Sequence, residues 1–125
     1  MSTPETETAT ETATVAATLS THVLNLDAGA PASNLNITLH SIDTEGNRID
    51  LLGQAVTNED GRAADWPKLN EGNYELCFLV SDWYDQQSLS SFYPRLRIEF
   101  RVDSSRHYHV PLLLNRFGFS SYRGS

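Results

Sequence analysis

Apolar and polar residues alternate through most of the chain from Leu19 onward. Alternation with period two places successive side chains on opposite faces of a strand, so it predicts half-buried β-strands. The clearest example is segment 95–102, where arginines and a glutamate interleave with four apolar residues: Leu96, Ile98, Phe100 and Val102. Turn-forming residues interrupt the alternation at short intervals. The sequence therefore predicts an all-β fold.

The alternating segments predict seven or eight short strands and one helix. Segment 73–80 is apolar on one face and partly apolar on the other, so we expect it in the centre of a sheet. Asp82 is expected to cap the helix, which would run to about Ser90. So many short strands favour a two-layer sandwich. The other predicted strands cover residues 19–27, 35–40, 48–57, 95–102, 106–114 and 117–123, with a further short strand after Arg62.

Length and composition indicate one folded domain preceded by a low-complexity extension. The chain has 125 residues, of which 39% are hydrophobic, which suffices for one core. Residues 1–18 repeat Thr, Ala and Glu and contain no basic residue, so we expect them to be disordered. The domain is expected to span residues 19–125.

Charge and hydropathy exclude several classes of partner. A net charge of -7 and a pI near 4.9 predict repulsion of nucleic acids and anionic membranes. We see neither a secretory signal pattern nor an apolar stretch of membrane-spanning length, so a cytoplasmic location is expected. The single cysteine, Cys77, lies in the apolar stretch ELCFLV and is predicted to be a buried thiol.

Strand phase groups reactive side chains with apolar ones. His22 shares a predicted strand face with Leu24 and Leu26, and His109 shares one with His107, Pro111 and Leu113. A solvated face seldom mixes histidine with leucine and proline in this way. Such faces are often buried against another subunit, where the polar groups line a pocket.

Four segments of the sequence carry a specific resemblance. They are STHVLN at 20–25, DGR at 60–62, HYHVPLLL at 107–114 and YRGS at 122–125. Together they resemble the 5-hydroxyisourate hydrolases, the enzymatic branch of the transthyretin-like fold. The terminal tetrapeptide discriminates best, whereas DGR alone is weak. The resemblance covers the chain from Leu19 onward.

The resemblance implies an architecture and a substrate. It implies a transthyretin-like sandwich of about eight strands with one short helix, assembled as a homotetramer, a dimer of dimers with its sites between the dimers. The implied substrate is 5-hydroxyisourate, the product of urate oxidation, whose six-membered ring is opened by water. No cofactor and no metal is expected. The catalytic residues implied are His22, Arg62, His109 and Tyr122, and the substrate-binding residues are His22, Arg62, Tyr122, Arg123 and Ser125.

The chemistry of these side chains suits the reaction. Imidazole titrates near neutral pH, so His22 and His109 are assigned to water activation and proton transfer, in an order that stays open. Arg62 would fork onto the carbonyl oxygens of the substrate as a planar, permanent cation. Tyr122 would hold the ring by a hydrogen bond, and Arg123 or the Ser125 carboxylate would complete the wall.

Other interpretations remain open. Taken singly, His22 reads as a structural histidine and Arg62 as an exposed loop residue, while His107 is expected at the surface or in support of the site. Zinc bound by His22, His107 and His109 is less favoured, because no Cys or carboxylate cluster accompanies them. The rival functions are a non-catalytic transthyretin-like protein that binds a small ligand and a plain β-sandwich interaction domain.

Overall fold

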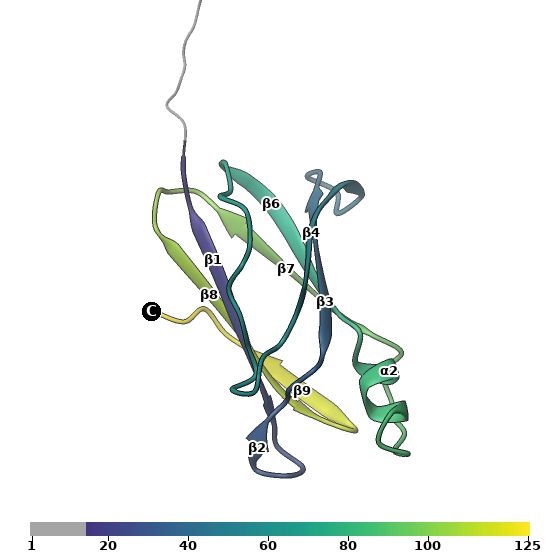
Figure 1. Cartoon of the computed structure of the whole chain (residues 1–125). Helices are drawn as coiled ribbons and strands as arrows, with labels where there is room; N and C mark the ends of the chain where they lie inside the picture. The colour runs from purple at the N-terminus through teal and green to yellow at the C-terminus, as the bar shows by residue number, and fades with distance from the viewer. Residues whose placement is uncertain (1–14) are drawn as a thin grey trace, which may run out of the picture.

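The structure is a two-layer β-sandwich with one short helix (Figure 1). It is a computed structural model that describes residues 15–125. This confirms the predicted all-β sandwich, with nine strands among the described residues. The first sheet has the order β2 (Ala30–Pro31), β1 (Thr18–Asn25), β8 (His107–Asn115) and β9 (Gly118–Ser121), with β5 (Arg62–Ala63) also paired to β1. The second has the order β4 (Arg48–Val56), β3 (Asn36–Ile42), β6 (Gly72–Phe78) and β7 (Leu96–Val102).

The core lies between the two sheets. Each sheet turns one set of alternate side chains inward, and these are the apolar positions of the sequence pattern. Strand β6 lies between β3 and β7, which confirms its predicted central position. The inward side chains with an exposed fraction of 2% or less include Leu19, Val23, Leu112 and Leu114 from the first sheet, and Ile37, Leu39, Leu76 and Phe78 from the second.

Strands β1 and β8 run parallel and side by side, although almost ninety residues separate them. In their register Ser20 lies opposite His109, and His22 lies opposite Pro111. The side chains that do not enter the core from these strands therefore share the outer face of the first sheet. This pairing is what brings the sequence-distant histidines together.

The helix α2 (Val80–Asp85) differs from the prediction at both ends. Its N-cap residue is Leu79, without a side-chain cap hydrogen bond, so the predicted capping by Asp82 is wrong. Asp82 lies instead in the first turn, where its negative charge suits the helix dipole. Val80 and Tyr84 are fully buried at i, i+4 spacing. This burial explains why the helix starts at Val80 and not after Asp82, the predicted cap. None of the helices within residues 15–125 is long and apolar enough to cross a membrane.

The folded part begins before the predicted boundary at Leu19. Ala17 is fully buried, and its backbone N–H donates to the Leu69 carbonyl at 2.9 Å. Thr18 is already the first residue of β1. Residues 15–18, part of the predicted disordered extension, therefore belong to the folded part, because Ala17 pairs with a residue far along the chain. Residues 1–14 lie outside the described part of the chain.

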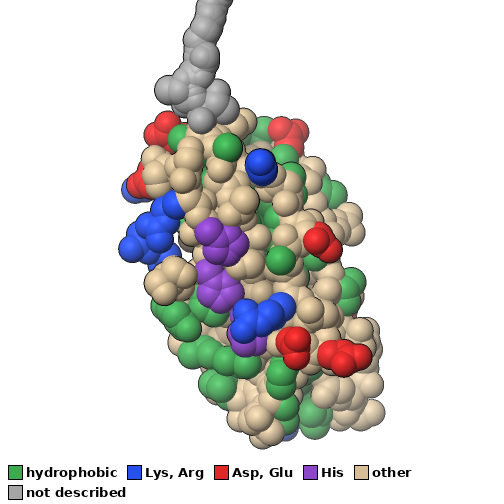
Figure 2. Space-filling model, turned by 60° about the vertical axis from the view of Figure 1, so that its left-hand side comes forward, with side chains coloured by type: hydrophobic (Ala, Val, Ile, Leu, Met, Phe, Trp, Pro, Cys, Tyr) green, Lys and Arg blue, Asp and Glu red, His purple; other side chains and the backbone are tan. Residues whose placement is uncertain are grey.

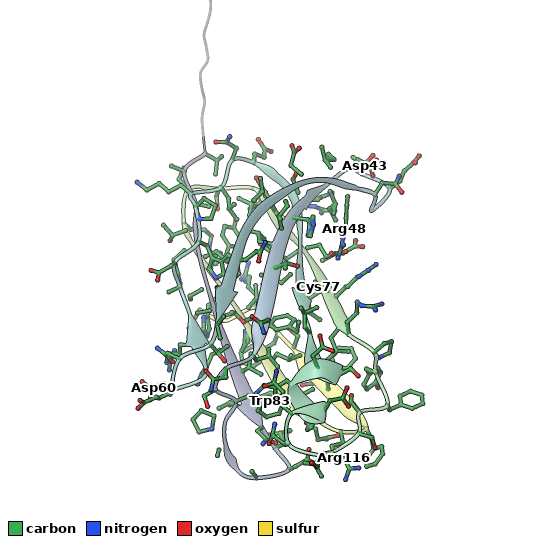
Figure 3. All side chains as sticks on the ribbon, turned by 45° about the vertical axis from the view of Figure 1, so that its right-hand side comes forward. Asp43, Arg48, Asp60, Cys77, Trp83 and Arg116 are labelled. Carbon is green, nitrogen blue, oxygen red and sulfur yellow. The ribbon has the colours of Figure 1, made fainter. Side chains whose placement is uncertain are left out.

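An ion pair between a buried glutamate and a more exposed arginine lies on the outer face of the second sheet. The carboxylate of Glu75, a residue only 3% exposed, accepts from the Arg48 guanidinium at 2.9 Å (Nε) and 2.7 Å (Nη2). Cys77 is also buried on β6, the strand that carries Glu75, as predicted. Figure 3 places Arg48 and Asp60 on opposite sides of the molecule, so this ion pair is remote from the turn at Asp60.

We expect Arg48→Met to lower the free energy of unfolding by about 2–3 kcal/mol, because a buried carboxylate that loses its partner stays desolvated and unpaired. Urea unfolding measures the loss. Arg95→Met, a substitution at an exposed arginine, is the matched control. A loss no larger than the roughly 0.5 kcal/mol of an exposed pair would contradict this account.

Candidate active site

Three histidines gather on the outer face of the first sheet. His22 comes from β1, and His107 and His109 come from β8. Figure 2 shows histidine side chains in a row on one face, with a basic side chain against them. Together with Arg62, which pairs with His22 across β1 and β5, these residues form what we call the histidine face. Three of the predicted catalytic residues therefore lie close together within one chain.

The tautomer of His22 is fixed by its hydrogen bond. Its Nε2 lies 2.9 Å from the backbone carbonyl oxygen of Asp60. A carbonyl oxygen only accepts, so Nε2 carries the hydrogen. In the neutral ring Nδ1 is then left with a free lone pair. His22 can therefore accept a proton on the nitrogen that the turn does not hold.

A tight turn places Arg62 beside His22. The Asn58 side-chain oxygen accepts from the backbone N–H of Asp60 at 2.9 Å and of Arg62 at 3.0 Å. Gly61 has φ +76°, and a Cβ there would lie 2.4 Å from the Val23 carbonyl oxygen. Only glycine allows this approach to β1. The glycine in the DGR motif therefore serves to place Arg62 at the histidine face.

His109 is held by a hydroxyl group and is half-buried. Its Nδ1 lies 2.8 Å from Ser20 Oγ. Burial lowers the pKa of His109 below its usual value, and the positive charge of Arg62 lowers it further. His109 is thus neutral near pH 7, which is the state that a general base requires.

The chain terminus packs against His109. The Gly124 N–H donates to the His109 carbonyl at 2.8 Å, and Gly124 is buried. A Cβ on Gly124 would lie 2.6 Å from Cδ2 of the His109 ring, so the terminal segment approaches the imidazole through a residue without a side chain. Sequence reasoning singled out the terminal tetrapeptide for Tyr122, Arg123 and Ser125, and missed this role of its glycine.

Two of the remaining predicted site residues, Tyr122 and Arg123, lie at another part of the surface. Tyr122 is 58% exposed. Neither Tyr122 nor Arg123 forms a hydrogen bond to His22, Arg62 or His109 within residues 15–125. Ser125 is exposed. Tyr122 and Arg123 line a different hollow, of about 350 Å³, together with Ile98, Phe100, Tyr108 and Val110.

Sequence reasoning also missed the hydroxyl groups of the histidine face. Ser20 Oγ contacts both His109 and His107, the latter at 2.7 Å from Nε2. Thr18 Oγ1 lies 2.7 Å from His107 Nδ1. Both ring nitrogens of His107 are thus engaged by hydroxyl groups. Thr18 and Ser20 share the strand phase of His22, and this is the signal that could have predicted their role.

Among the described residues, no three His, Cys, Asp or Glu side chains are arranged to hold a metal ion.

Comparison with known proteins decides the family. Residues 19–124 match the sequence profile of the HIUase/Transthyretin family. The chain belongs to this family. A 5-hydroxyisourate hydrolase of Halalkalibacterium halodurans is 42% identical over 117 residues, which cover 86% of this chain and 97% of that protein.

Solved structures of the HIUase/Transthyretin family agree in fold. The 5-hydroxyisourate hydrolase of Klebsiella pneumoniae has a TM-score of 0.76 and 35% identity, covering 87% of this chain and 99% of that one. Sea bream transthyretin, solved in complex with thyroxine, has a TM-score of 0.78 but only 20% identity, covering 85% and 93%. The likeness to transthyretin therefore shows the fold alone, whereas the hydrolases are similar in sequence as well.

Proposed function

We propose that this protein is a 5-hydroxyisourate hydrolase of urate degradation. The observation that carries the proposal is the histidine face, where two imidazoles from separate strands and the Arg62 guanidinium lie together. Hydrolysis of an amide-type bond in a ring needs an activated water and stabilisation of the oxyanion. The relatives named 5-hydroxyisourate hydrolase support this choice of substrate.

The two histidines divide the proton transfers between them. His22 has its lone pair on Nδ1, and the lowered pKa of His109 keeps that ring neutral near pH 7, so each ring has a nitrogen that can accept a proton. One accepts a proton from the attacking water as its oxygen adds to the ring carbonyl. As the C–N bond breaks, a proton is returned to the leaving nitrogen. The order in which the two rings act stays open.

Arg62 provides the fixed positive charge. Its backbone is held by the Asn58 side chain and by the pairing with β1, so the guanidinium extends from a defined position. A planar fork of N–H donors can bind the substrate's carbonyl oxygens and stabilise the negative charge that develops on attack. Binding at this residue therefore serves both orientation and catalysis.

Assembly of a second chain would complete the site. We propose a homotetramer, a dimer of dimers, in which Tyr122 closes the site from a neighbouring subunit and Arg123 or Ser125 completes its wall. Two observations support it: Tyr122 lies apart from the histidine face in one chain, and Leu26 on the continuation of β1 is 52% exposed. The cytoplasmic location stays a prediction from the sequence.

Turnover of freshly generated 5-hydroxyisourate tests the function. The ultraviolet decay of the substrate with catalytic amounts of protein is compared with decay in buffer. We expect acceleration. Decay at the buffer rate with stoichiometric protein would favour the rival, a transthyretin-like protein that binds a small ligand without converting it.

The pH dependence of kcat/KM tests the state of His109. Because neutral His109 is the active form and its pKa is lowered, activity should persist below pH 6.5, the ordinary histidine value, and fall only at more acidic pH. Arg62→Gln removes one of the charges that lower this pKa, so it should move the acidic limb to higher pH. An acidic limb above pH 6.5 in the wild type, or one that Arg62→Gln leaves in place, would contradict this assignment.

A further inference from the structure

We infer that Thr18, His107, Ser20 and His109 form one directed chain of hydrogen bonds that fixes the tautomer of His109, with its hydrogen on Nδ1 and a free lone pair on Nε2. The inference deepens the proposed hydrolase function and rests on it for its kinetic consequences. Thr18, Ser20 and His107 are then positioning residues, because they act on the substrate only through His109.

The contacts of the chain are continuous and short. Thr18 Oγ1 lies 2.7 Å from His107 Nδ1, and His107 Nε2 lies 2.7 Å from Ser20 Oγ. Ser20 Oγ lies 2.8 Å from His109 Nδ1. The parallel register of β1 and β8 creates this series, because it places Thr18 opposite His107 and Ser20 opposite His109.

Ser20 couples the two imidazoles. A serine hydroxyl has a single hydrogen, and Ser20 Oγ has no hydrogen-bond partner other than these two rings among residues 15–125. When the hydroxyl donates to one ring, it is free to accept from the other. The tautomer of one histidine therefore determines the tautomer of the other, and two directions of the chain are possible.

Charge at the histidine face selects the direction. Because Nδ1 of His109 faces Ser20, only Nε2 is left for substrate, water and nearby charges. Arg62 acts on His109 as a nearby positive charge, and its pairing with His22 places it at the same face. A permanent cation favours a lone pair over an N–H on the nitrogen left open to it. His109 therefore donates from Nδ1 to Ser20, Ser20 donates to His107 Nε2, and His107 Nδ1 donates to Thr18.

This direction prepares His109 for the reaction. With Nδ1–H held by Ser20, the Nε2 lone pair is available to accept a proton from water in every molecule. A wrong tautomer would present an N–H to the water and could not act as a base. The part of this hydrogen-bond chain far from His109, at Thr18 and His107, is exposed.

Nuclear magnetic resonance tests the tautomer without turnover. Long-range ¹H–¹⁵N correlation spectra of the ¹⁵N-histidine-labelled protein distinguish Nδ1–H from Nε2–H rings. We expect His109 as the Nδ1–H form above its pKa in the wild type, and both forms in Ser20→Ala. An Nε2–H form of His109 in the wild type, or a pattern that Ser20→Ala leaves unchanged, would overturn the inference.

Kinetics test the consequence. Ser20→Ala should lower kcat about tenfold with little change in KM, the size expected from losing one hydrogen bond that orients a base. Ser20→Thr keeps the hydroxyl and should recover most of kcat. Ser41→Ala is the matched control, because Ser41 lies in a strand of the other sheet and its hydroxyl oxygen accepts from the Asp50 N–H at 3.2 Å. Equal kcat values for Ser20→Ala and Ser41→Ala would overturn the inference.

The two experiments separate this inference from the proposed function. Suppose that the wild-type protein does not accelerate the decay of 5-hydroxyisourate but shows the Nδ1–H form of His109. The proposed function is then refuted, and the inferred hydrogen-bond chain stands. If the wild-type protein instead turns the substrate over with His109 in the Nε2–H form, the inferred hydrogen-bond chain is refuted and the proposed function stands.

Discussion

Replacing His109 with asparagine is expected to lower kcat by about 100- to 10,000-fold, the usual contribution of a positioned general base. Asparagine keeps a polar side chain next to Ser20 but cannot take up a proton at neutral pH. The loss should appear in the chemical step, so single-turnover rates with enzyme saturated by 5-hydroxyisourate are the measurement. Substrate binding should change much less than the rate.

A second histidine gives the matched control. His40 lies on β3 in the opposite sheet, and His40→Asn should leave the single-turnover rate unchanged. Thermal unfolding of both variants confirms that each is folded. If His109→Asn turned over substrate at the wild-type rate, His109 would have no part in the chemistry.

Replacing Arg62 with glutamine is expected to lower kcat/KM by about 100- to 1,000-fold, the size seen when one donor to a developing oxyanion is removed. Glutamine keeps an N–H donor but removes the charge and the fork. Steady-state kinetics with 5-hydroxyisourate give both constants. A rise in KM accompanied by a fall in kcat would show that Arg62 acts in binding and in the transition state.

Two further variants sharpen the test of Arg62. Arg62→Lys keeps the charge and loses the planar fork, so its activity should lie between those of the wild type and Arg62→Gln. Arg95→Gln removes a positive charge at an exposed position before β7 and should leave kcat/KM unchanged. If Arg62→Gln and Arg95→Gln behaved alike, the guanidinium of Arg62 would be a surface charge only.

The sequence predicted the strands better than their arrangement. Alternation of apolar residues such as Leu96 and Val102 reports directly on burial of one strand face, so strand positions follow from it. The parallel pairing of β1 with β8 joins segments far apart in the chain, and no local pattern encodes it. The helix start at Val80 was missed for a similar reason, because burial in the core determines it rather than a capping side chain.

Residue types and strand phase predicted part of the site. The hydrogen bonds between strands could not be predicted from the sequence. The phase of His22 and His109 placed them on outward faces that mix leucine with polar groups, and the structure brings these faces together. The roles of Ser20 and Gly124 depend on which strand lies beside His109, which the sequence pattern leaves open. Tyr122 was assigned by resemblance, and one chain alone keeps it away from the histidine face.

A crystal structure of the protein with a non-reactive purine analogue tests the central claim most directly. The account predicts that the analogue binds over the histidine face, with its carbonyl oxygens hydrogen-bonded to Arg62 and a water or ring atom within hydrogen-bond distance of His22 or His109. An analogue bound without contact to these three residues, for example only in the hollow lined by Tyr122 and Tyr108, would contradict it.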